Sequence, residues 1–165
     1  MSIFDLLIEP SRFDCALPVE MDALTETGTL LEAALLSASL DPTTGDARLL
    51  FDCRGALQLR NGNTAVVVVK NVSEFRWHAS PRRGSTWHAV MSWIPSPHPA
   101  GLAITAGLTP DADLQIVGLA GEFYVGNILG GDKPPPDFTS STPAEIRRGL
   151  ASWTSEIDVV GASFR

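Results

Sequence analysis

Apolar and polar positions alternate along much of the chain, in short stretches separated by turn residues. A period of two predicts strands, because successive side chains of a strand point to opposite faces. Residues 65–69 are apolar at every position instead, which predicts a central strand buried on both faces. The turn signal Asn61-Gly62-Asn63 precedes this run and predicts a hairpin that pairs residues 56–60 with residues 65–69.

The stretch 30–40 fits either a helix or a strand. A turn cluster at 41–46 and an alternating stretch at 47–53 favour strand, turn and strand. A loop is expected at 95–101. The remaining strand patterns lie at 74–78, 87–93, 102–108, 114–117, 122–125 and 159–164.

Two short helices complete the predicted elements. Ser2 caps one that Pro10 ends, and Thr142, Pro143 and Glu145 have the spacing of a capping box for the other. The pattern predicts a mostly β fold, an antiparallel sandwich or partly open barrel of about 8–9 short strands with two short helices. We expect a single domain over 1–165, with an acidic N-terminal arm at 1–27 and a Gly/Pro-rich connector at 126–141 leading into the second helix.

Charge is distributed unevenly. The net charge is -7, and residues 1–46 carry nine carboxylates and only one base. Such acidity argues against nucleic acid as a partner, because phosphates must be neutralised by Lys and Arg. It is typical of a solvated polar face or of a surface for a basic protein. The candidate partner-binding residues are Glu20, Asp22 and Glu26 in the acidic arm, and Arg82 and Arg83 in an expected turn.

The N-terminus lacks the pattern of a signal peptide, and no run approaches the roughly 20 apolar residues of a membrane helix. We therefore expect a cytoplasmic protein without a membrane partner. The excess of Arg over Lys, ten to two, is typical of GC-rich bacterial genomes. Cys15 and Cys53 have no metal-ligand spacing, and Cys53 fits a small buried hydrophobe.

The dipeptides Trp77-His78 and Trp87-His88 are the most distinctive candidates for a site. If their strands formed one hairpin with the tryptophans buried, both histidines would project from the opposite face. Three interpretations remain open: surface histidines behind a tryptophan core, a two-histidine pocket, or a metal site that lacks an evident third ligand. We assign no metal and no cofactor.

No catalytic framework is evident. The stretch 126–133 contains glycines and a lysine, but Asp132 stands beside Lys133 and no Ser or Thr follows, so it fails the phosphate-loop pattern. Arg147 and Arg148 fit a solvated helix face. The leading hypothesis is a non-catalytic protein that binds another protein through the acidic arm or an exposed sheet edge or face. The alternative is a small-molecule-binding sandwich or barrel, enzymatic or not, with a pocket lined by Trp77, His78, Trp87, His88, Trp93 and Tyr124.

Overall fold

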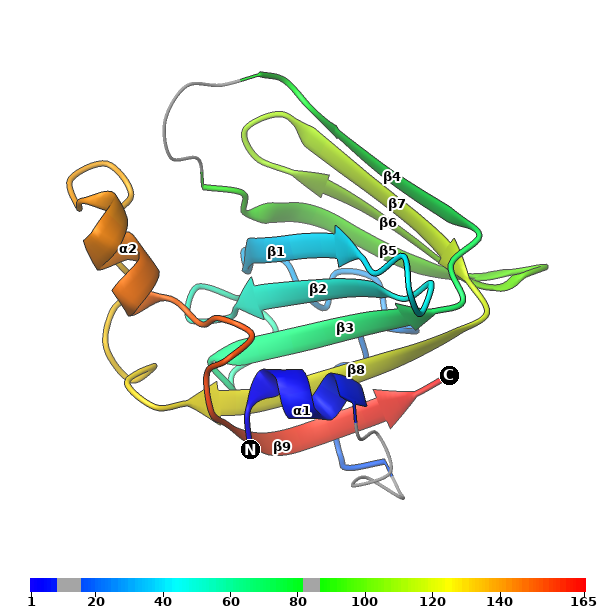
Figure 1. Ribbon diagram of the computed structural model, residues 1–165, viewed down its shortest axis with the longest axis horizontal. Coiled ribbons are helices and arrows are strands. Elements are labelled where there is room, and N and C mark those ends of the chain that lie inside the picture. The colour runs from blue at the N-terminus through cyan, green and yellow to red at the C-terminus, as the bar shows by residue number, and fades with distance from the viewer. Residues whose placement is uncertain (9–15, 82–86) are drawn as a thin grey trace.

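The computed structural model describes residues 1–8, 16–81 and 87–165. Their strands form two antiparallel sheets, which confirms the mostly β fold and gives a sandwich without barrel closure (Figure 1). The five-stranded sheet has the order β1 (Ala34–Leu40), β2 (Ala47–Asp52), β3 (Thr64–Lys70), β8 (Ala120–Ile128) and β9 (Ile157–Phe164). The four-stranded sheet has the order β4 (Glu74–Ala79), β7 (Ala112–Gly118), β6 (Gly101–Leu108) and β5 (Val90–His98).

The five-stranded sheet is covered on both faces. One face packs against the four-stranded sheet, where Phe51 and Trp93 meet edge to face with ring centroids 5.7 Å apart. On the other face, helix α1 (Ile3–Ile8) lies over β8 and β9 (Figure 1), and its buried side chains belong to one apolar cluster with Val66 and Tyr124. Because both faces of the sheet are covered, β3 is buried at successive positions. This burial explains its run of apolar residues and confirms the predicted central strand.

Both predicted helices are present, with the expected caps. The Ser2 hydroxyl accepts a hydrogen bond from the Asp5 N–H, while the Asp5 carboxylate accepts one from the Ser2 N–H. In α2 (Pro143–Gly149), Thr142 and Glu145 form the reciprocal capping box. Within the described residues, neither helix has the length and apolar character needed to cross a membrane.

The predicted hairpin through Asn61-Gly62-Asn63 is wrong. Residues 56–60 form no strand, and β3 pairs with β2 instead. The Asp52 carboxylate accepts hydrogen bonds from the Arg54 backbone and side chain and so turns the chain directly after β2. Asn63 then ties the end of the loop to β8, since its side-chain oxygen accepts the Ile128 N–H at 3.0 Å.

The predicted loop at 95–101 is also wrong in extent, because β5 continues to His98 and β6 begins at Gly101. Pro95 and Pro97 fit inside β5 since it is the edge strand of its sheet, where a missing N–H breaks no ladder bond. The ambiguous stretch 30–40 contains strand β1, as the turn cluster after it indicated.

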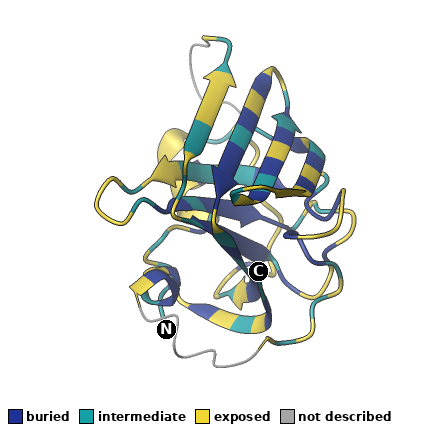
Figure 2. Ribbon diagram, turned by 90° about the vertical axis from the view of Figure 1, so that its right-hand side faces the viewer, coloured by how far each residue is buried: buried dark blue, intermediate teal, exposed yellow. Residues whose placement is uncertain are grey.

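The predicted hairpin of the two Trp-His segments does not form. β4 pairs with β7, β5 pairs with β6, and β4 and β5 occupy opposite edges of the four-stranded sheet. Buried positions recur at every second residue along β6, whereas β4 has no fully buried residue (Figure 2). The cause is topological: the β6–β7 hairpin inserts between the two strands that the sequence places one after the other.

Candidate functional site: an aromatic pocket beside strand β1

The six predicted ligand-binding residues fall in several places. Trp93 is fully buried between the sheets and donates its indole N–H to the Ala23 carbonyl at 2.8 Å. Tyr124 lies in the second apolar layer, where burial and the neighbouring Glu122 carboxylate raise its phenol pKa. His78 is exposed on β4, in register with Asp113 of β7. The structure thus places these three residues apart from one another.

Trp87 and His88 do share a pocket. Its volume is about 400 Å³, and it lies between the start of β1, the segment leading into β5, the Gly/Pro-rich connector and the end of α2. We call it the aromatic pocket. It is lined by Ala34, Leu35, Leu36, Trp87, His88, Phe138, Arg147, Leu150, Ala151 and Ser152.

The His88 ring is held in one orientation. Its Nδ1 lies 2.9 Å from the Thr109 carbonyl oxygen, and its ring packs edge to face against Trp77 with centroids 5.4 Å apart. A carbonyl oxygen only accepts, so Nδ1 carries the hydrogen and Nε2 of the neutral ring is an acceptor. The His88 backbone carbonyl also accepts the Leu35 N–H at 2.8 Å. Trp77, which is 40% exposed, therefore supports the pocket through His88.

The opposite wall comes from the connector, which leaves β8 at Ile128 and reaches α2 at Pro143. Phe138 packs edge to face on Trp87, with ring centroids 4.6 Å apart. The neighbouring Asp137 carboxylate accepts hydrogen bonds from the Thr139 hydroxyl and N–H and from the Ser140 hydroxyl. These donors lower the Asp137 pKa to about 2, and they fix the turn that presents Phe138.

Arg147 is the one permanently charged residue among the described residues that line the aromatic pocket. It is exposed, and no ion pair to it is formed within the described parts of the chain. The sequence indicated only a solvated helix face at this position. Helix α2 is short, and Ile146 is its one buried residue. Its pattern of apolar and polar residues therefore did not indicate that Arg147 borders a cavity.

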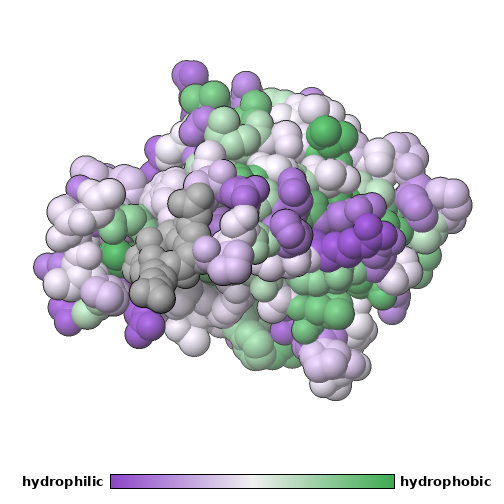
Figure 3. Space-filling view, turned by 90° about the horizontal axis from the view of Figure 1, so that it is seen from above, coloured by the Kyte–Doolittle hydropathy of each residue, from purple (hydrophilic) through white to green (hydrophobic). Residues whose placement is uncertain are grey.

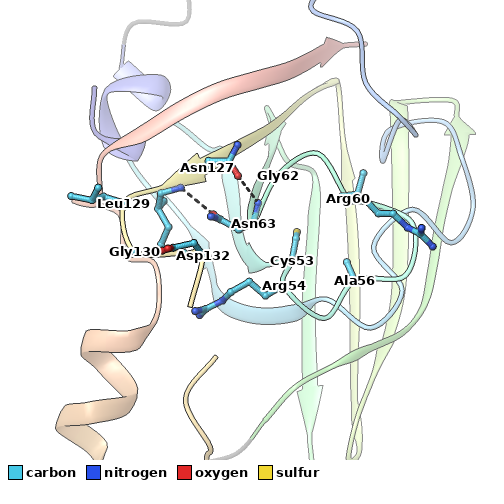
Figure 4. Close-up of a pocket in the computed structure, with 13 residues that line it drawn as sticks. Cys53, Arg54, Ala56, Arg60, Gly62, Asn63, Asn127, Leu129, Gly130 and Asp132 are labelled. Carbon is cyan, nitrogen blue, oxygen red and sulfur yellow. Dashed lines mark hydrogen bonds between the residues drawn. The ribbon is translucent and has the colours of Figure 1, made fainter. Parts of the chain in front are cut away.

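A second, more open cavity of about 700 Å³ lies at the end of the sandwich where β8 leaves the sheet (Figure 4). Cys53 lies at its base, and burial followed by the Asp52 charge raises the pKa of this thiol, so it is a poor nucleophile. The amides of Asn63 and Asn127 bond to the backbone of the adjoining segments. A Cβ at Gly131 would collide with the Asn63 amide, which explains a glycine in the loop that closes this cavity.

The three carboxylates of the acidic arm that were candidates for partner binding all accept hydrogen bonds within the chain. Glu20 accepts the N–H groups of Arg60 and Asn61, and Glu26 accepts the Asp22 N–H at 2.6 Å. Asp22 itself is buried and accepts hydrogen bonds from the Leu24 N–H and the Ser163 hydroxyl. The described part of the acidic arm is therefore attached to the sandwich by these groups. The other partner candidates, Arg82 and Arg83, lie outside the described residues.

Within the described ranges, no cluster of three or more His, Cys, Asp or Glu side chains is placed to hold a metal ion. Comparison of the chain with protein-family models, with curated proteins and with solved structures finds no significant match.

Proposed function

We propose that the protein binds a small molecule in the aromatic pocket, and that the ligand combines an aromatic or aliphatic body with one anionic group. The observation that carries the proposal is the meeting of Trp87, His88 and Phe138 around a cavity of about 400 Å³ with Arg147 at its border. Ligand pockets are typically apolar cavities of about 300–1,000 Å³ with a few convergent polar groups.

Each wall has a distinct role in this proposal. The indole of Trp87 and the ring of Phe138 offer apolar and edge-to-face contacts to a flat ligand body. The fixed His88 ring offers one oriented hydrogen-bonding nitrogen. Arg147 supplies the charge, and a guanidinium pairs with carboxylate, sulfonate or phosphate groups through parallel N–H donors.

Binding of two fluorescent probes of similar shape tests the proposal. The anionic probe is 8-anilinonaphthalene-1-sulfonate, and the neutral probe is N-phenyl-1-naphthylamine. We expect both to bind the folded protein with one-to-one stoichiometry. Trp87→Leu should weaken both probes about 10-fold, because it removes the aromatic wall. Trp77→Leu also removes an indole, but Trp77 does not line the pocket and supports it only through His88, so this variant should have a smaller effect.

Probe binding that is unchanged in Trp87→Leu would remove the aromatic pocket as the site. Absence of stoichiometric binding of either probe would do the same. Folding of every variant is checked by far-UV circular dichroism and by its urea midpoint, so that a loss of binding is attributed to the pocket.

A second function, binding of another protein, is favoured by the outer edge of β1. The Leu35 N–H points away from β2 and donates to the His88 carbonyl, whereas the Asp41 N–H points toward β2 and donates to the Asp46 carbonyl. Alternation along an antiparallel strand then directs the N–H and C=O groups of Ala38 and Leu40 outward. Such an edge accepts an extended segment of a partner protein as an added strand. On the side of the molecule seen from above, apolar groups lie interspersed with polar ones (Figure 3).

The edge is tested by capture of a partner with the immobilised chain. Leu40→Pro deletes an outward N–H and should abolish capture, whereas Leu40→Asn keeps this N–H and should retain it. Equal capture by both variants would rule out strand addition at β1.

A further inference from the structure

A further cavity of about 310 Å³ lies between the loop after β2, the connector after β8 and the end of α2. It shares Leu150 with the aromatic pocket, and it shares Arg54, Ile128, Leu129 and Gly130 with the open cavity. We call it the basic cavity. Three cationic side chains line it, those of Arg54, Lys133 and Arg148, and none of its described lining residues is acidic. The hydroxyl-bearing Ser155 and the backbone at Gly130 and Gly149 complete the polar part of its wall. Such a concentration of positive charge is unusual in a chain with a net charge of -7.

Arg54 forms the rigid part of this wall. Its guanidinium contacts the Asp52 carboxylate through Nε and Nη2, and it donates to the Lys133 carbonyl at 3.0 Å and to the Gly149 carbonyl at 2.7 Å. A guanidinium has five N–H groups, and these contacts leave one of them, on Nη1, without a partner in the described residues. Asp52 offsets the charge of Arg54, so Arg54 contributes a fixed donor.

The uncompensated charge comes from Lys133 and Arg148. Neither forms an ion pair within the described parts of the chain. Arg54 brings them to one cavity, because it bonds to the backbone of Lys133 itself and to that of Gly149, the residue after Arg148. Two like charges that share a cavity repel each other, and an anion between them would replace this repulsion with attraction.

Asp132 is the acidic residue nearest in sequence to Lys133. It lines the open cavity of Figure 4 and is not among the residues that line the basic cavity, although Arg54, Ile128, Leu129 and Gly130 border both cavities. In the sequence, Asp132 beside Lys133 counted against a phosphate loop, and these residues do lack its spacing. The basic cavity is a different arrangement, because its cations come from three separate segments and its described lining contains no carboxylate.

We infer that the basic cavity binds a phosphate group, either as free phosphate or as the head of a small organic phosphate. The lining of this cavity includes donor groups from four places along the chain: the Arg54 guanidinium, the Lys133 ammonium, the Arg148 guanidinium and the Ser155 hydroxyl, which also bonds to Ser152. A tetrahedral oxyanion has acceptors that match such a spread, and charge-assisted bonds to it are the strong ones. A volume of 310 Å³ leaves room for an organic body next to the phosphate.

Titration by two-dimensional amide NMR tests the inference, with inorganic phosphate and glycerol 3-phosphate as the probes and sodium chloride at matched ionic strength as the control. We expect saturable shifts at the amides of Gly130, Lys133, Gly149 and Ser155, with a Kd of about 1 mM or below. Tighter binding of glycerol 3-phosphate would identify an organic phosphate as the natural ligand class, and equal or weaker binding would identify free phosphate.

Lys133→Gln and Arg148→Gln should each raise this Kd about fivefold or more, since each removes a charge-assisted contact. Arg147→Gln is the matched control, because it removes one charge from the same helix but lines the aromatic pocket. Shifts that chloride reproduces, or that Arg147→Gln weakens as much as Arg148→Gln, would overturn the inference. Because the aromatic pocket is probed with different ligands and by Trp87→Leu, failure at one cavity leaves the result at the other intact.

Discussion

Arg147 and Arg148 are consecutive residues near the end of α2, yet they line different cavities. Arg147 borders the aromatic pocket, and Arg148 borders the basic cavity. The short segment from α2 to Leu150, which lines both cavities, thus separates two sites of different chemistry. Arg54, which lies just after β2, donates to the Gly149 carbonyl and so connects this segment to the five-stranded sheet.

Asp52→Asn should destabilise the fold by about 3 kcal/mol, because it leaves the guanidinium of Arg54 without its carboxylate partner in a largely buried setting. The Arg54 side chain is only 9% exposed and that of Asp52 only 4%. Urea unfolding provides the measurement. Arg76→Gln breaks an ion pair whose Arg76 side chain is 70% exposed and should cost less than about 1 kcal/mol. Equal costs for the two variants would show that the Asp52–Arg54 pair does not anchor this end of the molecule.

Asp137 should titrate in the folded protein with a pKa of about 2, below its ordinary value of 3.8, because Thr139 and Ser140 donate to its carboxylate. A depressed folded-state pKa means that this turn is stabilised above the ordinary pKa and loses that stabilisation as the pH falls through about 2. NMR of the carboxyl carbon gives the midpoint. In Thr139→Val the midpoint should move up toward 3.8, and an unshifted midpoint in the variant would contradict the assigned contacts.

Cys53 should resist iodoacetamide in the native protein at mildly alkaline pH. Burial and the nearby Asp52 charge raise its pKa, so the reactive thiolate is scarce and shielded. Mass spectrometry of the peptide that contains Cys53 measures the labelling, and the same reaction in urea provides the control. Rapid labelling without urea would show that the base of the open cavity is accessible to reagents.

Trp93→Phe should lower the free energy of unfolding by about 2–4 kcal/mol. The change leaves the buried Ala23 carbonyl without its indole donor and creates a void between the sheets. Trp77→Phe, at a side chain that is 40% exposed, should cost less than about 1 kcal/mol. Similar losses in urea unfolding for both variants would contradict the placement of Trp93 as the central core tryptophan.

The strands and caps could be predicted from the sequence because their signals are local. The all-apolar run in β3 marks a strand covered on both faces, and Thr142 with Glu145 marks the start of α2. Strand partners could not be predicted. The pairing of β4 with β7 depends on an inserted hairpin far along the chain, and so the histidine arrangement expected from consecutive strands was wrong.

The aromatic pocket shows the same limit. Trp87 and His88 stood out in the sequence, but Phe138 and Arg147 join them only because the connector and α2 lie beside the start of β1. Phe138 carried a weak signal as an aromatic residue after three prolines. Arg147 carried none, since an arginine on a short polar helix is typical of a solvated face.

The charge selectivity of the aromatic pocket provides the most direct test of the proposed function. The measurement is the Kd of 8-anilinonaphthalene-1-sulfonate and of N-phenyl-1-naphthylamine for the wild type, Arg147→Gln and Arg148→Gln. We predict that Arg147→Gln weakens the sulfonate probe about fivefold or more and leaves the neutral probe unchanged, while Arg148→Gln affects neither. Sulfonate binding that is equal in all three proteins, or lost equally in both variants, would contradict an anionic ligand in this pocket.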